Sequence, residues 1–439
     1  MGLTTPRTVA DPLMETLFPG APSAVEWGLD RMQAALAELD NPHLRYRTLH
    51  VGGTNGKGSV ASTWASVLQR HGDRAGLYTS PHLCSFRERI MIDGTPVSAD
   101  RVTATARRLR PLARRQRMSL FEACTLLALE IFAEEDVDSA CIEVGLGGRL
   151  DATNVIRPEV TAITNVALDH QEYLGDSLAQ IAAEKAGIIK PGIPVVTAED
   201  RPAALAVLKA RARDVGAPFH RIERWRDISG LGLGRRGTRF RLGTGGHAGL
   251  ELETPLPGSH QAINAALAVR ALECLAKPPS REAVREGVAR VRWPGRGQIH
   301  RLAGRHFIFD VAHNRAAVSA LARVLADMAP PRPLVVLAGI LGDKDWSRML
   351  PPLVDLADRV VFTIPSSAPA ERHWNPRVAA EEVGGGVPID IEGEMGAAVE
   401  RASALAGGGT VVVTGSCHTV GDALLVLGHD PFGGGEPGR

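Results

Sequence analysis

From Tyr46 onward the chain alternates between short apolar runs and longer segments in which apolar residues recur every three or four positions. This alternation predicts a mostly parallel sheet covered by helices, an α/β fold. Helices are expected between most of the strands, for example at Lys57 to Arg70 and at Leu120 to Glu134. The strands expected in this part are Tyr46 to Val51, Ala75 to Thr79, Ala140 to Val144, Val160 to Asn165 and Pro194 to Thr197.

Two later regions change the pattern. Between Arg224 and Pro257 the chain is rich in glycine and contains the alternating "TRFRL", which predicts antiparallel hairpins appended to the first sheet. From His306 a second alternation predicts a smaller, Rossmann-like α/β domain. Its expected strands are Phe307 to Asp310, Leu334 to Ala338, Val360 to Ile364, Ile389 to Ile391 and Thr410 to Thr414.

The proline and glycine residues of "RWPGRGQIH" predict a linker between these regions. We therefore expect a first domain over residues 1–295, of P-loop type with an N-terminal helical segment, and a second domain over residues 296–439. The glycine-rich tail "GHDPFGGGEPGR" is expected to be frayed.

Composition narrows the possible functions. The chain has 439 residues, 44% hydrophobic and 23% charged, which indicates a globular protein of two or three domains. Fifty Lys and Arg against 49 Asp and Glu leave a formal charge of +1, so a nucleic-acid-binding surface is not expected. The five cysteines form no C-x-x-C pair, which favours a reducing cytoplasm. Without a recognisable signal peptide or an apolar run near ~18 residues, we expect a soluble, cytoplasmic monomer without membrane contact.

The stretch "HVGGTNGKGSVAST", His50 to Thr63, resembles a phosphate-binding loop but departs from G-x-x-x-x-G-K-[ST] at Val51 and Gly58. Its position between a strand and a helix still favours phosphate binding, because amides at a helix N-terminus can hold phosphate oxygens. The alternative is a tight turn with a solvated lysine. The residues expected to bind phosphate are Gly53, Thr54, Asn55, Gly56, Lys57, Gly58 and Ser59.

Polar residues also follow the other predicted strands, where ligands of open α/β sheets bind. Glu143 ends a β-run, and a buried glutamate is costly unless it is paired or binds a cation. His170 could bind a metal, but most single histidines have an ordinary structural role. Lys185 could lie close to the metal, but it could also form an ion pair on a helix surface. Together with the phosphate loop, these residues predict magnesium-dependent phosphoryl transfer or hydrolysis. The strand-end residues are Thr79, Ser80, His82, Glu143, Asp169 and His170.

The motifs "GTNGKGS", "TSPHL", "EVGLGGRLDATN", "LDH" with "LG", "AEKAGIIK", "HQAINAALA", "PGR", "DVAHN", "DKDW" and "GSCHTVGDA" occur in one order over residues 22 to 427. In this combination the chain resembles the folylpolyglutamate synthase and dihydrofolate synthase family, which belongs to the ATP-dependent Mur ligases. The resemblance implies a ligase that uses ATP to convert a pterin-linked carboxylate into an acyl phosphate, which the amine of glutamate attacks. It implies dihydropteroate, folates and L-glutamate as substrates and no nucleophile on the enzyme.

The resemblance also implies site residues. Lys57 would hold ATP phosphates, and Lys185 resembles a family lysine that is carbamylated, with Lys190 as the second choice. The implied catalytic residues are Lys57, His170 and Lys185. The implied magnesium site consists of Ser80, Glu143, His170 and Lys185. Further ATP contacts are implied for Asn264, Arg296 and Asp310, and contacts with the acceptor or glutamate for Thr79, His82, Arg89, His313 and Ser416.

Arg315 stands where proline often follows "AHN" in the family. The motifs "DVAHN" and "GS-x-HTV" resemble those of bifunctional bacterial members, which favours both dihydrofolate synthesis and glutamate-tail extension. Two alternatives stay open: a cell-wall Mur ligase, and a nucleotide-binding module without ligase activity.

Overall fold

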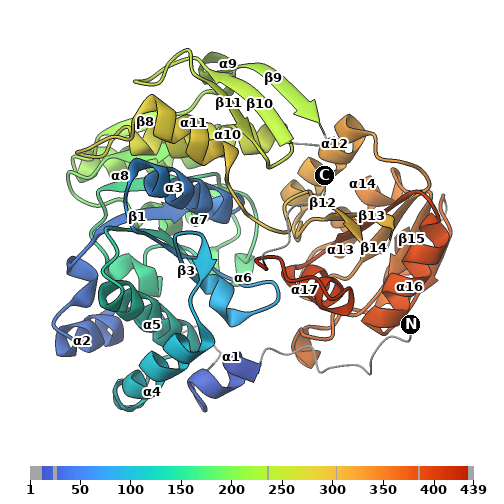
Figure 1. The fold of residues 1–439 in the computed structure, drawn as a ribbon, viewed down its shortest axis with the longest axis horizontal. Coiled ribbons are helices and arrows are strands. Elements are labelled where there is room, and N and C mark those ends of the chain that lie inside the picture. Colours follow the sequence, from blue (N-terminus) through green and yellow to red (C-terminus); the bar gives the residue numbers. More distant parts are fainter. Residues whose placement is uncertain (1–11, 23–26, 235–236, 303, 384–385, 434–439) are drawn as a thin grey trace.

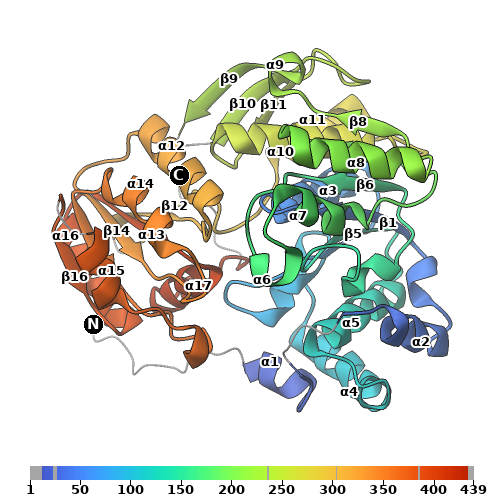
Figure 2. The same cartoon turned by 180° about the vertical axis from the view of Figure 1, so that it is seen from behind.

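The computed structural model describes residues 12–22, 27–234, 237–302, 304–383 and 386–433. Figures 1 and 2 show two sheet-based halves side by side, the first coloured blue to yellow and the second orange to red. The fold is mixed α/β, as predicted, with a large mostly parallel sheet in the first half.

The first sheet has the strand order β4-β3-β2-β5-β1-β6-β7-β8, and only the β2–β3 and β3–β4 pairs are antiparallel. All five predicted strands of this half are confirmed to within two residues, while β3, β4 and β8 were not predicted. The strands are β1 (Arg47–Gly52), β2 (Ala75–Tyr78), β3 (Ile90–Ile92), β4 (Thr95–Pro96), β5 (Ser139–Glu143), β6 (Val160–Ile163), β7 (Val195–Thr197) and β8 (Phe219–Arg221).

Helices cover both faces of this sheet. The α-helices are α1 (Pro12–Leu17), α2 (Asp30–Glu38), α3 (Lys57–His71), α4 (Ala99–Arg115), α5 (Leu120–Glu134), α6 (Gln171–Leu174), α7 (Leu178–Ala186), α8 (Pro202–Asp214), α9 (Arg224–Asp227), α10 (Ser259–Leu272) and α11 (Arg281–Ala289). Short 3₁₀ helices are η1 (Pro42–Leu44), η2 (Phe86–Arg89) and η3 (Ala152–Val155). Because successive strand residues point to opposite faces, Val196 packs with α3 and α10 while Val195 packs towards α7 and α8.

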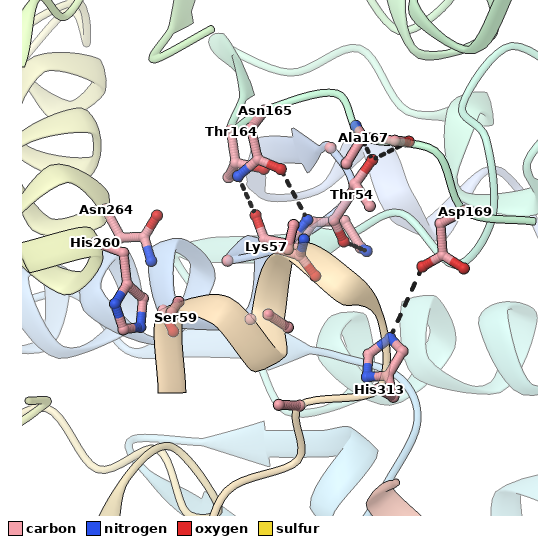
Figure 3. A pocket seen from close by; sticks show the side chains of 18 of the residues that line it. Thr54, Lys57, Ser59, Thr164, Asn165, Ala167, Asp169, His260, Asn264 and His313 are labelled. Carbon is pink, nitrogen blue, oxygen red and sulfur yellow. Dashed lines mark hydrogen bonds and ion pairs between the residues drawn. The ribbon is translucent and has the colours of Figure 1, made fainter. Parts of the chain in front are cut away.

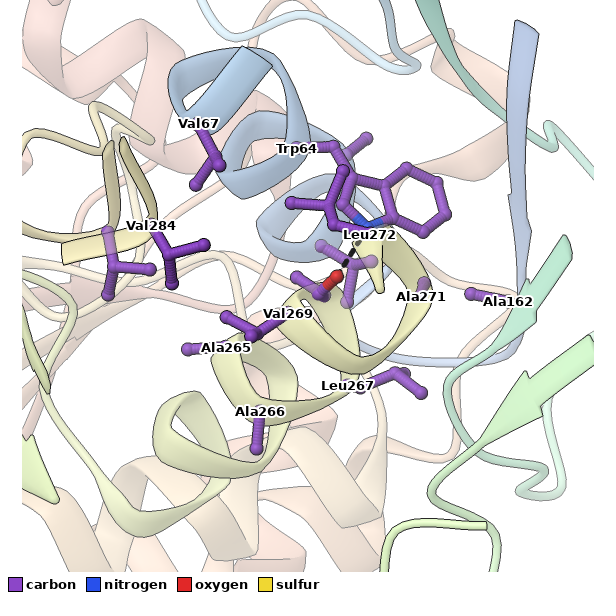
Figure 4. Packing of buried hydrophobic residues seen from close by; sticks show 14 of the residues in the cluster. Trp64, Val67, Ala162, Ala265, Ala266, Leu267, Val269, Ala271, Leu272 and Val284 are labelled. Atoms are coloured by element: carbon purple, nitrogen blue, oxygen red, sulfur yellow. Dashed lines mark hydrogen bonds between the residues drawn. The ribbon is translucent and has the colours of Figure 1, made fainter. Parts of the chain in front are cut away.

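The packing of α3 on α10 fixes the helix that follows the glycine-rich loop. Trp64 of α3 is fully buried, and its Nε1 donates a hydrogen bond to the carbonyl oxygen of Ala268, 3.0 Å away. Figure 4 shows the Trp64 ring among side chains of α10 that include Leu272. The start of α3 is therefore held by a large apolar core.

The predicted hairpins are confirmed as a three-stranded antiparallel sheet. Its strands are β9 (Ile228–Gly234), β10 (Gly237–Leu242) and β11 (Glu251–Thr254). This sheet packs on α10 and α11, and β9 also approaches α12 (Arg315–Met328) of the second half.

The second sheet has the order β12-β13-β17-β14-β15-β16, and its β12–β13 pair is antiparallel. Its five predicted strands are confirmed, whereas β12 was not predicted. The strands are β12 (Gln298–Leu302), β13 (Arg305–Phe309), β14 (Leu334–Ala338), β15 (Arg359–Phe362), β16 (Ile389–Ile391) and β17 (Thr410–Thr414). The helices are α12, α13 (Trp346–Met349), α14 (Pro351–Val354), η4 (Ala370–Arg372), α15 (Pro376–Val383), α16 (Met395–Ala406) and α17 (Cys417–Val426).

The end of the predicted linker forms strand β12, because the chain pairs with β13 immediately after the bends at Gly295 and Gly297. The domain boundary at 295/296 stays a prediction. Of the described helices, none has the length and apolar character needed to cross a membrane.

The tail was predicted to be frayed, and this is wrong for its described part. Phe432 packs against the core of the first half, and the Pro431 carbonyl oxygen accepts a hydrogen bond from Arg292 Nη2 at 3.3 Å. Burying a phenyl ring offsets the flexibility expected of the neighbouring glycines. Residues 434–439 lie outside the described residues.

Candidate active site

A cavity of about 410 Å³ lies between the two halves, where the carboxyl ends of β1, β5 and β6 face the start of α12. All seven residues of the glycine-rich loop line it. Figure 3 shows Lys57, Asp169, Asn264 and His313 around this space. Of the other predicted site residues, the cavity is lined by Ser80, Glu143, His170, Lys185, Asn264, Arg296, Asp310 and His313.

The glycine-rich loop is held in shape by the chain that follows β6. The Asn55 amide donates to Asn165 Oδ1 at 3.1 Å, and Asn165 Nδ2 donates to the Asn55 carbonyl oxygen at 2.9 Å. The Thr54 hydroxyl accepts from the Ala167 amide at 2.9 Å. Lys57 Nζ donates to the Thr54 carbonyl oxygen at 3.2 Å. The loop is therefore ordered by its own half of the protein.

The departures from the usual phosphate-loop pattern have a packing cause. Gly56 has φ 87°, and a Cβ atom there would lie 2.6 Å from Asn264 Oδ1. A Cβ atom on Gly58 would collide with the indole of Trp293, which excludes the Ser or Thr of the usual pattern. Val51 belongs to β1 and is fully buried in the core.

Glu143 and Ser59 place buried oxygen atoms at the cavity without strong partners. Glu143, at the end of β5, is 5% exposed, and its recorded hydrogen bond comes from the Ser80 amide at 3.4 Å. Burial raises the pKa of its carboxyl group, while the charges of Lys57 and Arg296 oppose this shift. The Ser59 hydroxyl is buried and has no hydrogen-bond partner among the described residues. Such oxygen atoms suit a magnesium ion, which prefers oxygen ligands.

The residues present suit a magnesium ion that takes most of its ligands from water and from the phosphates of ATP. Within the described ranges, no three His, Cys, Asp or Glu side chains gather into a metal-binding group. His170 lies just before α6 with a left-handed backbone, φ 50°. Burial, aided by the charge of Lys344, lowers the pKa of its imidazole to about 4. At neutral pH this ring is neutral, the form that binds metals.

Lys185 is a buried lysine on α7 with 3% exposure. Burial, together with the charge of Lys57, lowers the pKa of its amine to about 7. Its Nζ makes no hydrogen bond or ion pair with the described part of the chain, so the alternative of a helix-surface ion pair is wrong. Lys190 lies outside the cavity lining and donates to the Asn154 carbonyl oxygen at 2.8 Å.

The three further ATP-contact candidates also line the cavity, and Asn264 lies directly against the phosphate loop at Gly56. Asn264, on α10, is 7% exposed, and its Nδ2 donates to Gln261 Oε1 at 3.0 Å. Arg296 lies with its guanidinium 5.7 Å from the centroid of the Trp293 ring. Asp310 accepts from the amides of residues 297 and 312, and burial raises the pKa of its carboxyl group to about 6. The fold thus brings together residues nearly 50 positions apart.

Four of the five residues predicted to bind acceptor or glutamate do not line the cavity. Thr79 is 1% exposed, and Arg89 Nε donates to His82 Nδ1 at 2.9 Å. Ser416 caps α17 by accepting from the Thr419 amide at 3.0 Å. Only His313 of this set lies at the cavity wall, so the binding roles of the others stay predictions.

Known proteins identify the family. The Mur ligase middle domain matches residues 51–272, and the Mur ligase, glutamate ligase domain matches residues 295–417. The dihydrofolate synthase/folylpolyglutamate synthase of Mycobacterium tuberculosis is 35% identical over 445 residues, covering 93% of this chain and 91% of that protein. The chain belongs to this family of Mur ligases. The folylpolyglutamate synthase of Lacticaseibacillus casei is 39% identical over 347 residues, which covers 76% of this chain and 80% of that protein.

Solved structures agree with this assignment. The Mycobacterium tuberculosis folylpolyglutamate synthase complexed with ADP has a TM-score of 0.86 at 34% identity, covering 95% of this chain and 97% of that one. Escherichia coli FolC in complex with DHPP and ADP has a TM-score of 0.80 at 30% identity, covering 96% and 99%. As a dihydrofolate synthase/folylpolyglutamate synthase family member, the protein is an ATP-dependent ligase that joins glutamate in folate metabolism. This sets aside the non-catalytic module and the cell-wall ligase.

In this ligase, several cavity residues have no strong local signal in the sequence. The cavity is also lined by His260, the first residue of "HQAINAALA", and by five residues of α12: Ala316, Ala317, Ala320, Leu321 and Arg323. The small residues of "RAAVSALARV" after "DVAHN" were the sequence feature that could have indicated that this helix lines a cavity. Arg315 begins α12 on the exposed side, and Asn314 caps the helix by accepting from the Ala317 amide at 2.9 Å. The helix therefore forms with Arg315 as its first residue.

An aromatic pair at the edge of the cavity was also missed. Trp27 is 37% and Tyr173 46% exposed, and their ring centroids are 6.4 Å apart in an edge-to-face arrangement. They adjoin Gly147 and Leu174, which line the cavity. Exposed aromatic rings beside a cavity suit a flat ligand.

Proposed function

We propose that this ligase attaches L-glutamate both to dihydropteroate and to folylpoly-γ-glutamate, in each case through an acyl phosphate. One observation carries the proposal. The phosphate loop with Lys57 and three residues of the glutamate ligase domain, Arg296, Asp310 and His313, line the same cavity. A phosphorylated acceptor and an incoming amine can therefore meet in one enclosed space.

In the first step, an oxygen of the acceptor carboxylate attacks the γ-phosphorus of ATP, and ADP leaves. We assign Lys57 and the loop amides to the phosphates, because they lie at the N-terminus of α3. The Lys57 charge offsets negative charge on the phosphoryl oxygens as the bond to ADP breaks. We assign Asn264, beside Gly56, and Arg296 and Asp310 from the C-terminal half to orienting the nucleotide.

In the second step, the neutral amine of glutamate attacks the acyl carbon, an amide bond forms, and phosphate leaves. One proton of the amine passes to the departing phosphate in this step. We assign His313 and, from the N-terminus of α17, Ser416 to the glutamate or the departing phosphate. Thr79, His82 and Arg89 are assigned to the acceptor side, with Trp27 and Tyr173 receiving the pterin ring.

Magnesium would be held by Ser80, Glu143 and His170 beside the phosphate loop. When bound, the ion neutralises phosphate charge and polarises the transferred group. The buried carboxylate of Glu143, which accepts one long hydrogen bond from the Ser80 amide, supports this assignment. Action as a monomer is supported by a cavity whose described lining comes from one chain, and action in the cytoplasm is supported by five cysteines that form no disulfide.

We also assign Lys185 as a carbamylated residue. Only a neutral amine adds to carbon dioxide, and the depressed pKa of about 7 keeps much of this amine neutral at physiological pH. The product would place an anion beside Lys57 and the magnesium ligands. The absence of a carboxylate partner for Lys185 in the described chain supports a modification over an ion pair.

The test offers the purified protein ATP, magnesium and glutamate with either dihydropteroate or a reduced folate monoglutamate, and resolves the products by mass. We expect one added glutamate on each acceptor and ADP formation that requires both acceptor and glutamate. Product from only one acceptor would contradict bifunctionality. ADP formation that ignores both acceptors would contradict the proposed ligase chemistry.

A further inference from the structure

One buried carboxylate at the cavity has no task in the chemistry above. Asp169 follows β6, immediately before His170, and its side chain is 9% exposed. Lys344 Nζ, from the loop after β14, lies 2.8 Å from Asp169 Oδ1 and is itself 8% exposed at the side chain. The two charges belong to opposite halves of the protein. Their ion pair exists only while the halves are together.

A second contact joins the same carboxylate to the phosphate loop. The two hydrogens of the Asn314 amide are both used: Nδ2 donates to Asp169 Oδ2 at 3.0 Å and to Asn55 Oδ1 at 2.9 Å. Asn55 Nδ2 in turn donates to Asn314 Oδ1 at 3.3 Å. Figure 3 shows Asp169 turned towards His313, whose Nε2 lies 4.0 Å from Asp169 Oδ2. The C-terminal half thus contacts the phosphate loop and the residue before His170 through one network.

Burying this ion pair is not in itself stabilising, because both charges lose their hydration. A buried pair that crosses between two halves instead sets their relative position, since either partner left alone in the closed form would be an uncompensated charge. Cavity closure also excludes water, which would otherwise hydrolyse an acyl phosphate. This ion pair therefore controls the relative position of the two halves and the exclusion of water from the cavity.

We propose that Lys344 is a positioning residue of the ligation: by binding Asp169 across the interface, it holds the glutamate ligase half against the phosphate loop and keeps acyl phosphate from water. The part that concerns acyl phosphate rests on the proposed function. The part that concerns closure does not.

The neighbouring residue provides a matched control. Asp343 pairs with Arg372 at 2.8 Å, and both belong to the C-terminal half. The Asp343→Asn variant removes an ion pair from the same turn but leaves the interface between the halves unchanged. Lys344→Met keeps most of the side-chain stem and removes only the charge.

The first experiment measures ADP and amide product together in the full-length enzyme. For Lys344→Met we expect a fall of about 10- to 100-fold in kcat for amide formation, as misplacement of reacting groups causes. Amide formed per ADP should fall to less than half of the wild-type ratio, while the Kd for AMPPCP should rise by a smaller factor than kcat falls, because Asn165 and Ala167 of the loop's own half still hold the loop. Asp343→Asn should match the wild type. An unchanged ratio in Lys344→Met, or an equal loss in Asp343→Asn, overturns the proposal.

A double-mutant cycle tests whether the two residues act as a pair. Asp169→Asn is nearly isosteric, and combined with Lys344→Met it should be within about threefold of the worse single variant in kcat. If the two single-variant losses in kcat multiply in the double variant, the two residues act independently and the proposal that they act as a pair is rejected. Melting temperatures of all variants establish that each is folded.

Small-angle X-ray scattering with AMPPCP separates this inference from the proposed function. The Lys344→Met variant should have a larger radius of gyration than the wild type and Asp343→Asn. If the wild type fails to ligate but this difference is found, the proposed function fails and the closure contact stands. If ligation occurs but the radii are equal, the closure role of Lys344 is rejected.

Discussion

Two regions of the cavity wall differ in how their polar groups are satisfied. The phosphate loop is tied to the chain after β6 through Asn55, Asn165 and the Thr54 hydroxyl. The neighbouring group of Ser59, Glu143 and Lys185 is buried but has almost no partners among the described residues. The loop is shaped before any ligand arrives, whereas the charged group is left to be satisfied by what binds.

This difference has an energetic cause. A buried polar atom without a partner costs free energy, so a fold keeps several at one place only where a ligand compensates them. Hydrogen-bonded loop atoms carry no such cost. Substituting a residue that supplies them breaks the hydrogen bonds that shape the loop. Substitutions of the hydrogen-bonded or closely packed loop residues should therefore disturb local packing, whereas substitutions of Glu143, Lys185 or the Lys57 ammonium should remove function without unfolding.

The largest effect is expected for Lys57→Ala. Within the described part of the chain its ammonium makes one hydrogen bond, to the Thr54 carbonyl oxygen, so the fold should survive its removal. Turnover should fall roughly 100-fold or more, about 2.7 kcal/mol of transition-state stabilisation. Steady-state ADP release, with circular dichroism as the fold control, checks this. Near wild-type activity would remove Lys57 from the phosphate site.

Lys185 tests whether the unpartnered group needs an anion. Lys185→Ala should be nearly inactive, and Lys185→Arg no better, because the carbamate contributes negative oxygen and arginine cannot form one. A small carboxylic acid added to the alanine variant should partly restore turnover. Mass spectrometry of the native protein under bicarbonate gives a readout independent of activity, an added carbon dioxide on the peptide that contains Lys185. Full activity of the arginine variant would contradict the carbamate.

Glu143→Gln probes the same region by charge alone. The amide keeps the shape of the side chain but removes an anionic oxygen from the proposed magnesium side. We expect the magnesium concentration for half-maximal activity to rise about tenfold, with ATP affinity at saturating magnesium changed much less. A magnesium titration identical to that of the wild type would make Glu143 a structural residue.

The sequence predicts one of these regions better than the other. The seven loop residues are contiguous, so a strand-loop-helix pattern was sufficient to place them together. The strands were found because each buried run is apolar, whereas β3, β4 and β8 have only two or three residues and were missed. Contacts such as Asp169–Lys344 join residues 175 positions apart and leave no periodic signal. The family resemblance includes the motifs that contain Asp169 and Lys344, "LDH" and "DKDW", but it does not indicate that these two residues form an ion pair.

The smallest effect, and the sharpest test of the preformed loop, concerns Gly58. Gly58→Ser would supply the residue that follows the lysine in the usual phosphate-loop pattern, yet its Cβ atom would collide with the Trp293 indole. We expect a loss of about 1–3 kcal/mol in the free energy of unfolding, as overpacking causes, and a several-fold lower activity. Trp293→Ala in the same chain should recover part of the stability lost through the serine, because the two side chains compete for one space. Thermal and denaturant unfolding of the two single variants and the double variant measures this coupling. If serine is tolerated without loss, packing is not the reason that glycine follows Lys57, and the loop has more freedom than its hydrogen bonds imply.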